Sequence, residues 1–398
     1  MEVGIVGKPN IGKSTFFSAA TLSAAEIASY PFTTIKPNVA VGYAITDCPC
    51  KELQIECAPN NSKCKNGKRL IPVQLIDVAG LVPGAHEGKG LGCQFLDDLR
   101  QAHALIHILD ISGSSDDEGK SCKAGDHDPA NDVKFLEDEI DYWFLGIVKK
   151  QWDKLSRQIQ SQHEDFYKFL AENLAGIGIL EDHIRKAIKE LDLDIEKPNG
   201  WDDDDLLKFT RACRRHSKPI VIAANKCDIS NSKDNFDKVS EQFPDYKMIP
   251  CSAESELALV RAADKGLIKY TRGDSSFEIV GDMDEKQKKA LGFIKEQVMD
   301  KFGSTGVEDV LNTAVFDLLE LIPVYPVEDE NKFSDKNGNA LPDVYLMPKG
   351  STAIELAYKV HTSIGDGFIT AINCRTKRKI GKEYELQSND IIKIVAKS

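Results

Sequence analysis

The chain has 398 residues, of which 41% are apolar and 29% are charged, and its formal net charge is −12. This length predicts two or three domains with a substantial core, and the acidic balance argues against general attraction to nucleic acid or to an anionic membrane. No apolar run reaches the roughly 18–20 residues of a membrane span, and no signal-peptide pattern is visible before Val3. We therefore expect a cytoplasmic protein with no membrane or DNA partner.

The first predicted element is an apolar strand that leads directly into a glycine-rich loop. The loop has the spacing G-x-x-x-x-G-K-S and is followed by a helix-compatible segment, a context typical of a P-loop. Its backbone N–H groups would surround the β-phosphate, its lysine would span the β- and γ-phosphates, and its serine hydroxyl would bind Mg²⁺. The predicted nucleotide-binding residues here are Gly7, Lys8, Pro9, Asn10, Ile11, Gly12, Lys13, Ser14 and Thr15.

Two more strands are predicted over 39–45 and 71–76, and the second ends in the sequence D-V-A-G. A carboxylate at a strand end suits a water-mediated hold on Mg²⁺, and the glycine N–H can sense a γ-phosphate. The motif is weak alone but strong at this distance after a P-loop. Asp77 is therefore predicted to bind Mg²⁺ through water, and Gly80 to contact the nucleotide and contribute to catalysis.

Further strands are predicted over 105–111, 219–224 and 247–250, and two of them end in motifs suited to reading a base. Asp228 can accept hydrogen bonds from guanine N1–H and N2–H₂, which adenine does not offer. Asn225 would face the N7 and O6 edge, and the stem of Lys226 would cover the ring. Backbone N–H groups at Ser252 and Ala253 would reach O6. Motifs at successive strand ends predict a doubly wound α/β sheet with its ligand at the carboxyl ends of the strands.

A long segment between Gly113 and Ser217 interrupts this pattern. Apolar residues recur there at spacings of three and four, which predicts amphipathic helices. They include Phe135, Leu136, Ile140, Trp143, Phe144, Ile147, Val148 and Trp152. We interpret the segment as an inserted helical hairpin or small helical domain, with the Trp and Phe stripe forming its core rather than a partner-binding face.

The C-terminal part is predicted to contain helices over 284–301 and 307–319 and then a small α+β unit. In this unit we expect strands over 343–347, 368–373 and 391–395, and a helix over 353–361. From residue 346 onward nine Lys/Arg face five Asp/Glu, so this end of an acidic chain is basic.

Three segments carry a resemblance to the Obg family of P-loop GTPases: Tyr30–Pro37, which is similar to a first switch, Gly7–Ser14, and Asp77–His86. The whole chain resembles the YchF-like archaeal branch with a C-terminal TGS domain. The resemblance implies a Ras-like G domain with a helical insertion and a ubiquitin-like β-grasp. The expected segments are 1–125 with 216–275 for the G domain, 126–215 for the insertion, 276–321 for a helical linker and 322–398 for the TGS-like domain.

The resemblance also implies that Thr34 coordinates Mg²⁺ in the triphosphate state and that the protein acts on or near the ribosome. The chain departs from typical YchF proteins, which have a degraded base-reading motif and prefer ATP, because its N-K-C-D motif is intact. We therefore expect GTP and GDP as ligands, with a YchF-type ATPase as the alternative.

The predicted catalytic residues are Lys13, Thr34, Gly80 and His86. Ras-like enzymes place a water-orienting Gln directly after D-x-x-G, but Leu81 stands there, which predicts slow intrinsic hydrolysis helped by a partner or cation. Asn10 resembles the K⁺-coordinating Asn of some relatives, or else it only shapes the turn. His86 would position water from a mobile segment, or else it is an exposed loop residue.

Four cysteines cluster between the second and third predicted strands: Cys48, Cys50, Cys57 and Cys64. Four thiolates suit tetrahedral Zn²⁺, although the C-x-C-x₆-C-x₆-C spacing is not that of common zinc ribbons. Disulfides and unpaired thiols are the alternatives left open.

A second cluster, of basic residues, comprises Arg375, Lys377, Arg378, Lys379 and Lys382. It is a candidate contact for RNA or the ribosome, or else a solvated hairpin tip. Two functions of different classes follow for the whole chain. One is a Mg²⁺-dependent, slowly hydrolysing GTPase switch associated with translation. The other is a nucleotide-gated protein-binding scaffold with little turnover.

Overall fold

The computed structural model describes residues 1–21, 38–81, 84, 98–162 and 165–397 and divides the chain into two compact units. The first unit comprises the described residues of 1–21, 38–40 and 74–310. The second holds residues 41–73 together with everything from Leu311 onward. Residues 41–73, part of the expected G-domain segment, are grouped with the C-terminal residues in this division, and the four expected segments stay a prediction.

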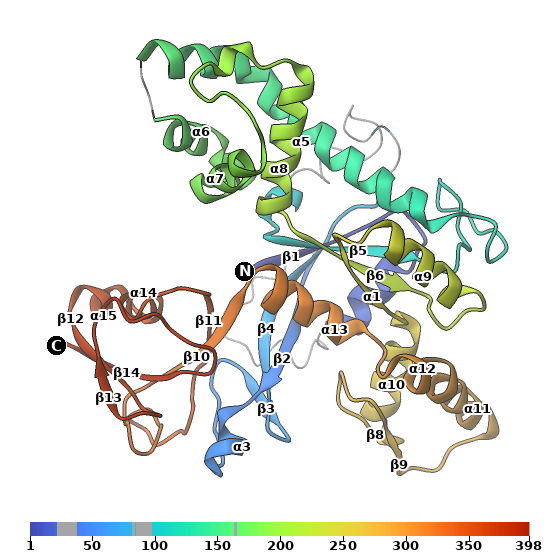
Figure 1. The fold of residues 1–398 in the computed structure, drawn as a ribbon. Helices are drawn as coiled ribbons and strands as arrows, with labels where there is room; N and C mark the ends of the chain where they lie inside the picture. Colours follow the sequence, from blue (N-terminus) through green and yellow to red (C-terminus); the bar gives the residue numbers. More distant parts are fainter. Residues whose placement is uncertain (22–37, 82–83, 85–97, 163–164, 398) are drawn as a thin grey trace. The chain divides into compact units, whose positions relative to one another are not determined.

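The larger sheet has seven strands in the order β2-β4-β1-β5-β6-β7, with β3 paired to β4 (Figure 1). Its strands are β1 (Glu2–Val6), β2 (Val39–Asp47), β3 (Lys63–Lys65), β4 (Lys68–Asp77), β5 (Ala104–Asp110), β6 (Ile220–Asn225) and β7 (Lys247–Pro250). Strands β4, β1, β5, β6 and β7 pair in parallel, and β5 and β6 are buried along their whole length. Continuous apolar strands are expected where helices cover both faces of a parallel sheet. The predicted doubly wound α/β domain is confirmed.

The insertion consists of helices that gather in one group, green in Figure 1. They are α5 (Pro129–Gln162), α6 (Phe166–Leu174), α7 (Glu181–Glu190) and α8 (Asp203–Ser217). The rings of Trp152 and Trp201 stack with centroids 5.0 Å apart. The aromatic stripe lies in a core that also contains Val6 and Leu105 of the sheet. The predicted core role of the stripe is confirmed, but the core continues into the sheet and is not confined to the insertion.

The remaining helices and strands of the first unit, including one helix that continues into the second, are short. They are α1 (Lys13–Ala20), α9 (Ser232–Gln242), α10 (Ala253–Asp264), β8 (Ile268–Lys269), β9 (Glu278–Ile279), α11 (Glu285–Ile294), α12 (Asp300–Phe302) and α13 (Val307–Asn312). No helix among the described residues is long and apolar enough to cross a membrane.

The second unit contains a five-stranded sheet in the order β11-β10-β14-β12-β13. Its elements are α3 (Pro49–Leu53), β10 (Leu321–Val327), β11 (Tyr345–Pro348), α14 (Ala353–Val360), α15 (Thr362–Asp366), β12 (Phe368–Asn373), β13 (Arg378–Ile380) and β14 (Ile391–Ala396). A parallel β10–β14 pair inside an otherwise antiparallel sheet, with a helix after β11, is the arrangement expected of a β-grasp.

Strand β10 was not predicted, because its two prolines indicate the start of a module rather than a strand. Proline lacks the N–H that a central strand needs. Here the neighbouring residue supplies the donor, since the Tyr325 N–H binds the carbonyl oxygen of Asp390 (2.8 Å). Pro323 takes part as an acceptor from the Asn389 N–H (2.8 Å). Both prolines therefore fit positions where no ladder donor is required.

A buried ion-pair network joins α5 to α8. Arg214 is 1% exposed and donates to Asp141 (2.8 Å) and Glu137 (2.9 Å). Asp141 is fully buried and also accepts from Arg211 (3.0 Å). Charges removed from water need such partners, and deleting one partner leaves the other unpaired in the interior.

We predict that Arg214→Ala lowers the free energy of unfolding by about 3–5 kcal/mol, because it leaves the buried Asp141 carboxylate with Arg211 as its remaining cation and opens a space where the Arg214 side chain was buried. Denaturant titration of the nucleotide-free protein measures the change. Arg185→Ala is the matched control, since Arg185 forms an exposed pair with Glu181 and its loss should change stability much less. Equal effects of the two substitutions would contradict the assignment of Arg214 as a structural cation.

Candidate nucleotide-binding site

The loop between β1 and α1 is held in a conformation that only glycine adopts easily at two positions. Gly7 has φ 147° and Gly12 has φ 92°. A Cβ atom on Gly7 would lie 2.8 Å from the Ile108 carbonyl oxygen, and one on Gly12 would lie 2.4 Å from Asn225 Nδ2. Gly12 then caps α1, so free N–H groups face the loop at the helix start. The phosphate cradle at this loop stays a prediction, and the loop leaves backbone N–H groups free for it.

Lys13 and Asp77 lie beside each other at the end of β4. Lys13 Nζ donates to the Val78 carbonyl oxygen (2.8 Å) and is 3.8 Å from Asp77 Oδ1. Burial lowers the pKa of Lys13 and raises the pKa of Asp77, and in each case the attraction between the two groups opposes the shift. Asp77 Oδ1 is buried and receives no hydrogen bond from the described residues. Together with Ser14 in the first turn of α1, this oxygen suits a hydrated Mg²⁺.

The side chain of Asn225 connects three segments of the site. Its Nδ2 donates to the Ile11 carbonyl oxygen (3.0 Å), and its Oδ1 accepts from the Ala253 N–H (3.1 Å). The residue is 3% exposed at the end of β6. One amide thus fixes the loop after β1 to the loop after β7, and its own polar atoms are satisfied by the protein.

The predicted base-reading carboxylate is also held by its neighbours. Ser252 Oγ donates to Asp228 Oδ1 (2.8 Å), so the loop after β7 orients the carboxylate. Lys226 has φ 63° and its Nζ donates to Asp110 (2.7 Å) and Ser114 (3.1 Å). This contact anchors the lysine head and leaves its stem to cover a ring.

The end of the D-V-A-G motif and the residue after it pack tightly on the P-loop. The Leu81 N–H donates to the Gly7 carbonyl oxygen (3.2 Å), and the Leu81 side chain is 1% exposed. A Cβ atom on Gly80 would lie 3.3 Å from Pro9 Cγ. Leu81 is therefore a core residue and does not replace the water-orienting Gln.

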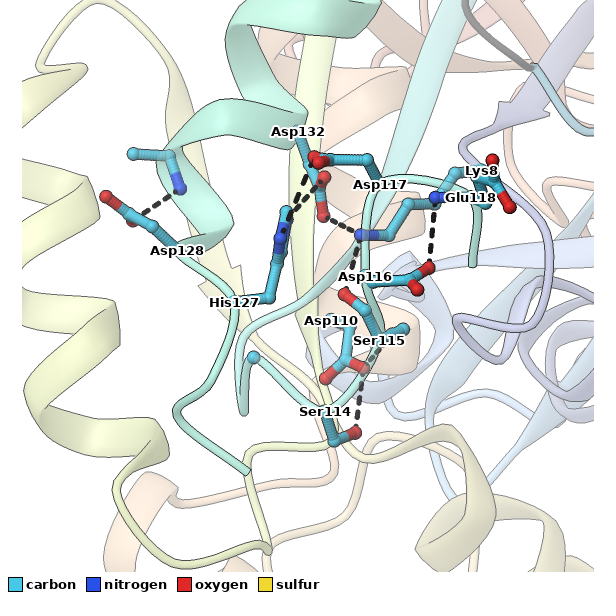
Figure 2. Close-up of polar contacts among 12 residues, drawn as sticks. Lys8, Asp110, Ser114, Ser115, Asp116, Asp117, Glu118, His127, Asp128 and Asp132 are labelled. Carbon is cyan, nitrogen blue, oxygen red and sulfur yellow. Dashed lines mark hydrogen bonds and ion pairs between the residues drawn. The ribbon is translucent and has the colours of Figure 1, made fainter. Parts of the chain in front are cut away.

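The loop between β5 and α5, which has no predicted role, lies against the P-loop. Lys8 is 2% exposed, and its Nζ lies 2.7 Å from Asp132 Oδ2 and 2.9 Å from the Ser115 carbonyl oxygen (Figure 2). Asn10 Nδ2 donates to the Gly119 carbonyl oxygen (3.1 Å). The loop that follows β5 therefore supports two of the predicted nucleotide-binding residues from outside the cradle.

Asp110, at the end of β5, organises the start of this loop. It accepts hydrogen bonds from Ser114 and Ser115 (Figure 2). It also accepts from Ser112 and Lys226. Burial alone would raise its pKa, but these donors outweigh burial and the pKa is lowered. The signal in the sequence was the D-I-S-G-S-S run directly after an apolar strand, which places an acid among hydroxyl donors.

A cluster of two aspartates and a histidine lies beside this loop, and a lysine side chain already contacts it. His127 Nε2 lies 2.8 Å from Asp132 Oδ1, and its Nδ1 lies 3.8 Å from Asp117 (Figure 2). The donor atoms of these three residues are close enough to hold a metal. The ammonium group of Lys8, however, sits against the same Asp132 carboxylate. We assign the group as the ion-pair partner of the P-loop lysine.

The structure brings together the predicted nucleotide-binding residues of four separate segments. They are Gly7, Lys8, Pro9, Asn10, Ile11, Gly12, Lys13, Ser14, Thr15, Asp77, Gly80, Asn225, Lys226, Asp228, Ser252 and Ala253, all in the first unit and at or after the carboxyl ends of β1, β4, β6 and β7. Thr34 and His86 lie outside the described residues. The individual roles of all these residues stay predictions.

We predict that Asn225→Asp destabilises the nucleotide-free protein by about 1–3 kcal/mol, because a carboxylate oxygen cannot donate to the Ile11 carbonyl and leaves it unsatisfied. Chemical denaturation measures the difference. Asn173→Asp is the control, since its amide donates to the Phe169 carbonyl at an exposed site. An unchanged unfolding free energy for Asn225→Asp would remove the bridging role of this amide.

Comparisons with known proteins agree with this geometry. Residues 2–135 match the family profile described as 50S ribosome-binding GTPase. Residues 223–329 match the Obg-like GTPase YGR210-like, G4 motif-containing domain, and residues 334–396 match the TGS domain.

Similar whole chains are found in archaea and bacteria. An uncharacterized GTP-binding protein of Methanocaldococcus jannaschii is 52% identical over 396 residues, covering 99% of this chain and 98% of the relative. A crystal structure of a GTP binding protein from Pyrococcus horikoshii OT3 matches with 48% identity and a TM-score of 0.80, covering both chains completely. The ribosome-binding ATPase YchF of Bacillus subtilis is 25% identical over 415 residues, covering 98% of each chain.

Proposed function

Because this chain belongs to the Obg-like GTPase family that also includes the YchF proteins, we propose that it binds GTP with Mg²⁺ and hydrolyses it slowly. The observation that carries guanine specificity is the arrangement at the end of β6. Asp228 is oriented by Ser252, and Asn225 is fixed between Ile11 and Ala253. A carboxylate held in this way is suited to two N–H donors of guanine, and adenine lacks that pair of donors.

The proposed roles on the phosphate side follow from the loop geometry. The N–H groups between Gly7 and Ser14 would surround the β-phosphate, and Lys13 would exchange its contact with the Val78 carbonyl for phosphate oxygens. Ser14 and Thr34 would hold Mg²⁺ directly, and Asp77 would hold it through water. When bound, Mg²⁺ neutralises charge that develops on the phosphates.

The proposed slow turnover rests on Leu81, which stands where Ras-like enzymes have a water-orienting Gln. Its side chain is apolar and buried. We propose that His86 or a K⁺ ion held by Asn10 assists the reaction. The contact between Asn10 Nδ2 and Gly119 fixes the amide and leaves Oδ1 as its acceptor atom. A fixed positive charge there would stabilise the transition state for phosphoryl transfer.

We further propose that the protein is a switch that acts on the ribosome, with GTP ordering Thr34 and Gly80 and hydrolysis releasing the partner. The names of the relatives and the basic C-terminal segment support this. Part of that segment is already neutralised within the second unit, since Arg375 pairs with Glu52 (2.7 Å). Arg378 and Lys379 on β13 are exposed and available to phosphate oxygens.

We predict that Asp228→Asn weakens GDP binding by about 10- to 100-fold, because guanine then loses at least one of its two hydrogen bonds to a charged carboxylate. Binding of xanthosine diphosphate (XDP) should improve in the same variant, because the Asn amide can donate to the carbonyl at C2 of xanthine. Calorimetric titration of wild type and variant with GDP, XDP and ADP measures both effects.

Asp245→Asn removes an equal charge from an exposed site and serves as the control for this substitution. Unchanged GDP affinity in Asp228→Asn would refute the base-reading role. If ADP binds to the wild-type protein as tightly as GDP does, the YchF-type ATPase is favoured instead.

We predict that the protein sediments with ribosomes of the source organism in the presence of a non-hydrolysable GTP analogue and not with GDP, at moderate salt. The double charge reversal Arg378→Glu, Lys379→Glu should reduce the bound fraction by about tenfold or more, because two phosphate contacts are lost. The control variant, Lys286→Glu, Lys289→Glu, reverses an equal number of charges on α11. Absence of binding in both nucleotide states would remove the ribosome from the proposal.

A further inference from the structure

The four clustered cysteines converge on one point in the second unit. Cys48 follows β2, Cys50 lies in α3, Cys57 lies in the loop after α3, and Cys64 lies in β3. Their sulfur atoms are all within 4.8 Å of one another. The Cys48–Cys57 separation is 4.0 Å and the Cys50–Cys64 separation is 3.7 Å.

We propose that Cys48, Cys50, Cys57 and Cys64 bind one structural Zn²⁺. A Zn–S bond of about 2.3 Å in a tetrahedron implies sulfur–sulfur separations of about 3.8 Å, close to those of the cluster. Two disulfides would instead draw the sulfurs into two pairs at about 2.05 Å and leave the pairs apart. Four donors at comparable mutual distances favour the metal over either disulfide pairing.

The backbone holds the donors in this arrangement. The Cys48 N–H donates to the Gly67 carbonyl oxygen in the turn between β3 and β4 (2.8 Å), and Gly67 has φ 77°. The Ile55 N–H donates to the Cys50 carbonyl oxygen (3.1 Å) where α3 ends. Cys48 and Cys50 are buried, and Cys57 and Cys64 are partly exposed. Four protein thiolates would fill all four coordination positions, as in structural zinc sites.

A second, independent observation is the guanidinium group beside the cluster. Arg69 is fully buried and stands directly opposite Cys64 in the β3–β4 pair. Its contacts are the Ser62 hydroxyl (3.1 Å), the Leu341 carbonyl oxygen (2.6 Å) and the face of the Tyr325 ring (5.2 Å to the centroid).

In the described part of the chain, no carboxylate lies within ion-pair distance of Arg69, and its Nε has no acceptor. A buried cation needs a counter-charge. Zn²⁺ with four thiolates carries a net charge of about −2 and supplies it.

The cluster also lies where it can fix the C-terminal sheet to residues 41–73. The Ala58 and Asn60 N–H groups donate to the carbonyl oxygens of Ala340 (2.9 Å) and Pro342 (2.6 Å). Asn61 exchanges hydrogen bonds with the Val344 backbone in both directions (2.9 and 3.0 Å). Zinc would stabilise the loops that make these contacts, so metal binding and folding of this unit are coupled.

The first test is the metal content of the full-length protein, measured by elemental analysis after purification without chelator. We expect about one Zn²⁺ per chain in the wild type and a loss of at least tenfold in Cys57→Ser, Cys64→Ser. The control is Cys374→Ser, because Cys374 is fully buried in the same core and is not a member of the cluster. The proposal would be overturned by metal-free protein in which the four clustered cysteines either form two disulfides or are all free thiols, as measured by intact mass.

A second measurement does not depend on a variant that folds. Wild-type protein loaded with Co²⁺ in place of Zn²⁺ should show the intense visible absorption of a tetrahedral thiolate site, and Zn²⁺ should abolish it. A spectrum typical of oxygen ligands would place the metal elsewhere and overturn the assignment. GDP affinity measured in parallel tests the nucleotide site separately, since its residues lie in the first unit.

Discussion

The side-chain amide of Asn225 determines how the two halves of the nucleotide site meet. Its donor holds the Ile11 carbonyl and its acceptor holds the Ala253 N–H, so the phosphate loop and the loop after β7 are fixed to the same strand end. The close approach also explains Gly12, because a Cβ atom there would overlap Asn225 Nδ2. A glycine of one motif and an asparagine of another, more than two hundred residues apart, are thus one steric and hydrogen-bonded unit.

Around this bridge, the lysines of the site are matched to acidic groups of neighbouring segments. Lys8 pairs with Asp132, and Lys226 pairs with Asp110. Lys13 differs, because its closest partner is the Val78 carbonyl and Asp77 is 3.8 Å away. Pairing at Lys8 and Lys226 fixes those side chains in place, whereas the looser position of Lys13 is compatible with the phosphate contact proposed for it.

The sequence predicted the strand ends and the motifs on them because each depends on local chemistry: an apolar strand, a glycine at positive φ, and a polar residue after the strand. It did not predict the support from the loop after β5, since Gly119 and Ser115 contribute backbone oxygens that any polar loop possesses. Strand β10 was missed because its prolines are compatible with the sheet only through the donor pattern of Tyr325 and Asn389. The place of residues 41–73 in the second unit depends on long-range contacts with residues such as Ala340 and Val344, which no local pattern encodes.

The buried cations Arg214, Lys8 and Arg69 differ in the groups that balance their charge. Arg214 is neutralised by Asp141 and Glu137, and Lys8 by Asp132, so each lies beside a carboxylate of its own unit. Arg69 is as deeply buried, yet among the described residues its neighbours are a hydroxyl, a carbonyl oxygen and an aromatic ring. Neutral acceptors satisfy hydrogen bonds but not charge, and a desolvated charge is costly unless it is balanced. Asp343 attracts Arg69 at longer range but forms no ion pair with it. Thiolates of the adjacent cluster would add the missing balance, and thiolates gathered at such short separations are stable only around a cation. The same balance of charge that holds Lys8 of the P-loop therefore favours a metal among the four sulfurs.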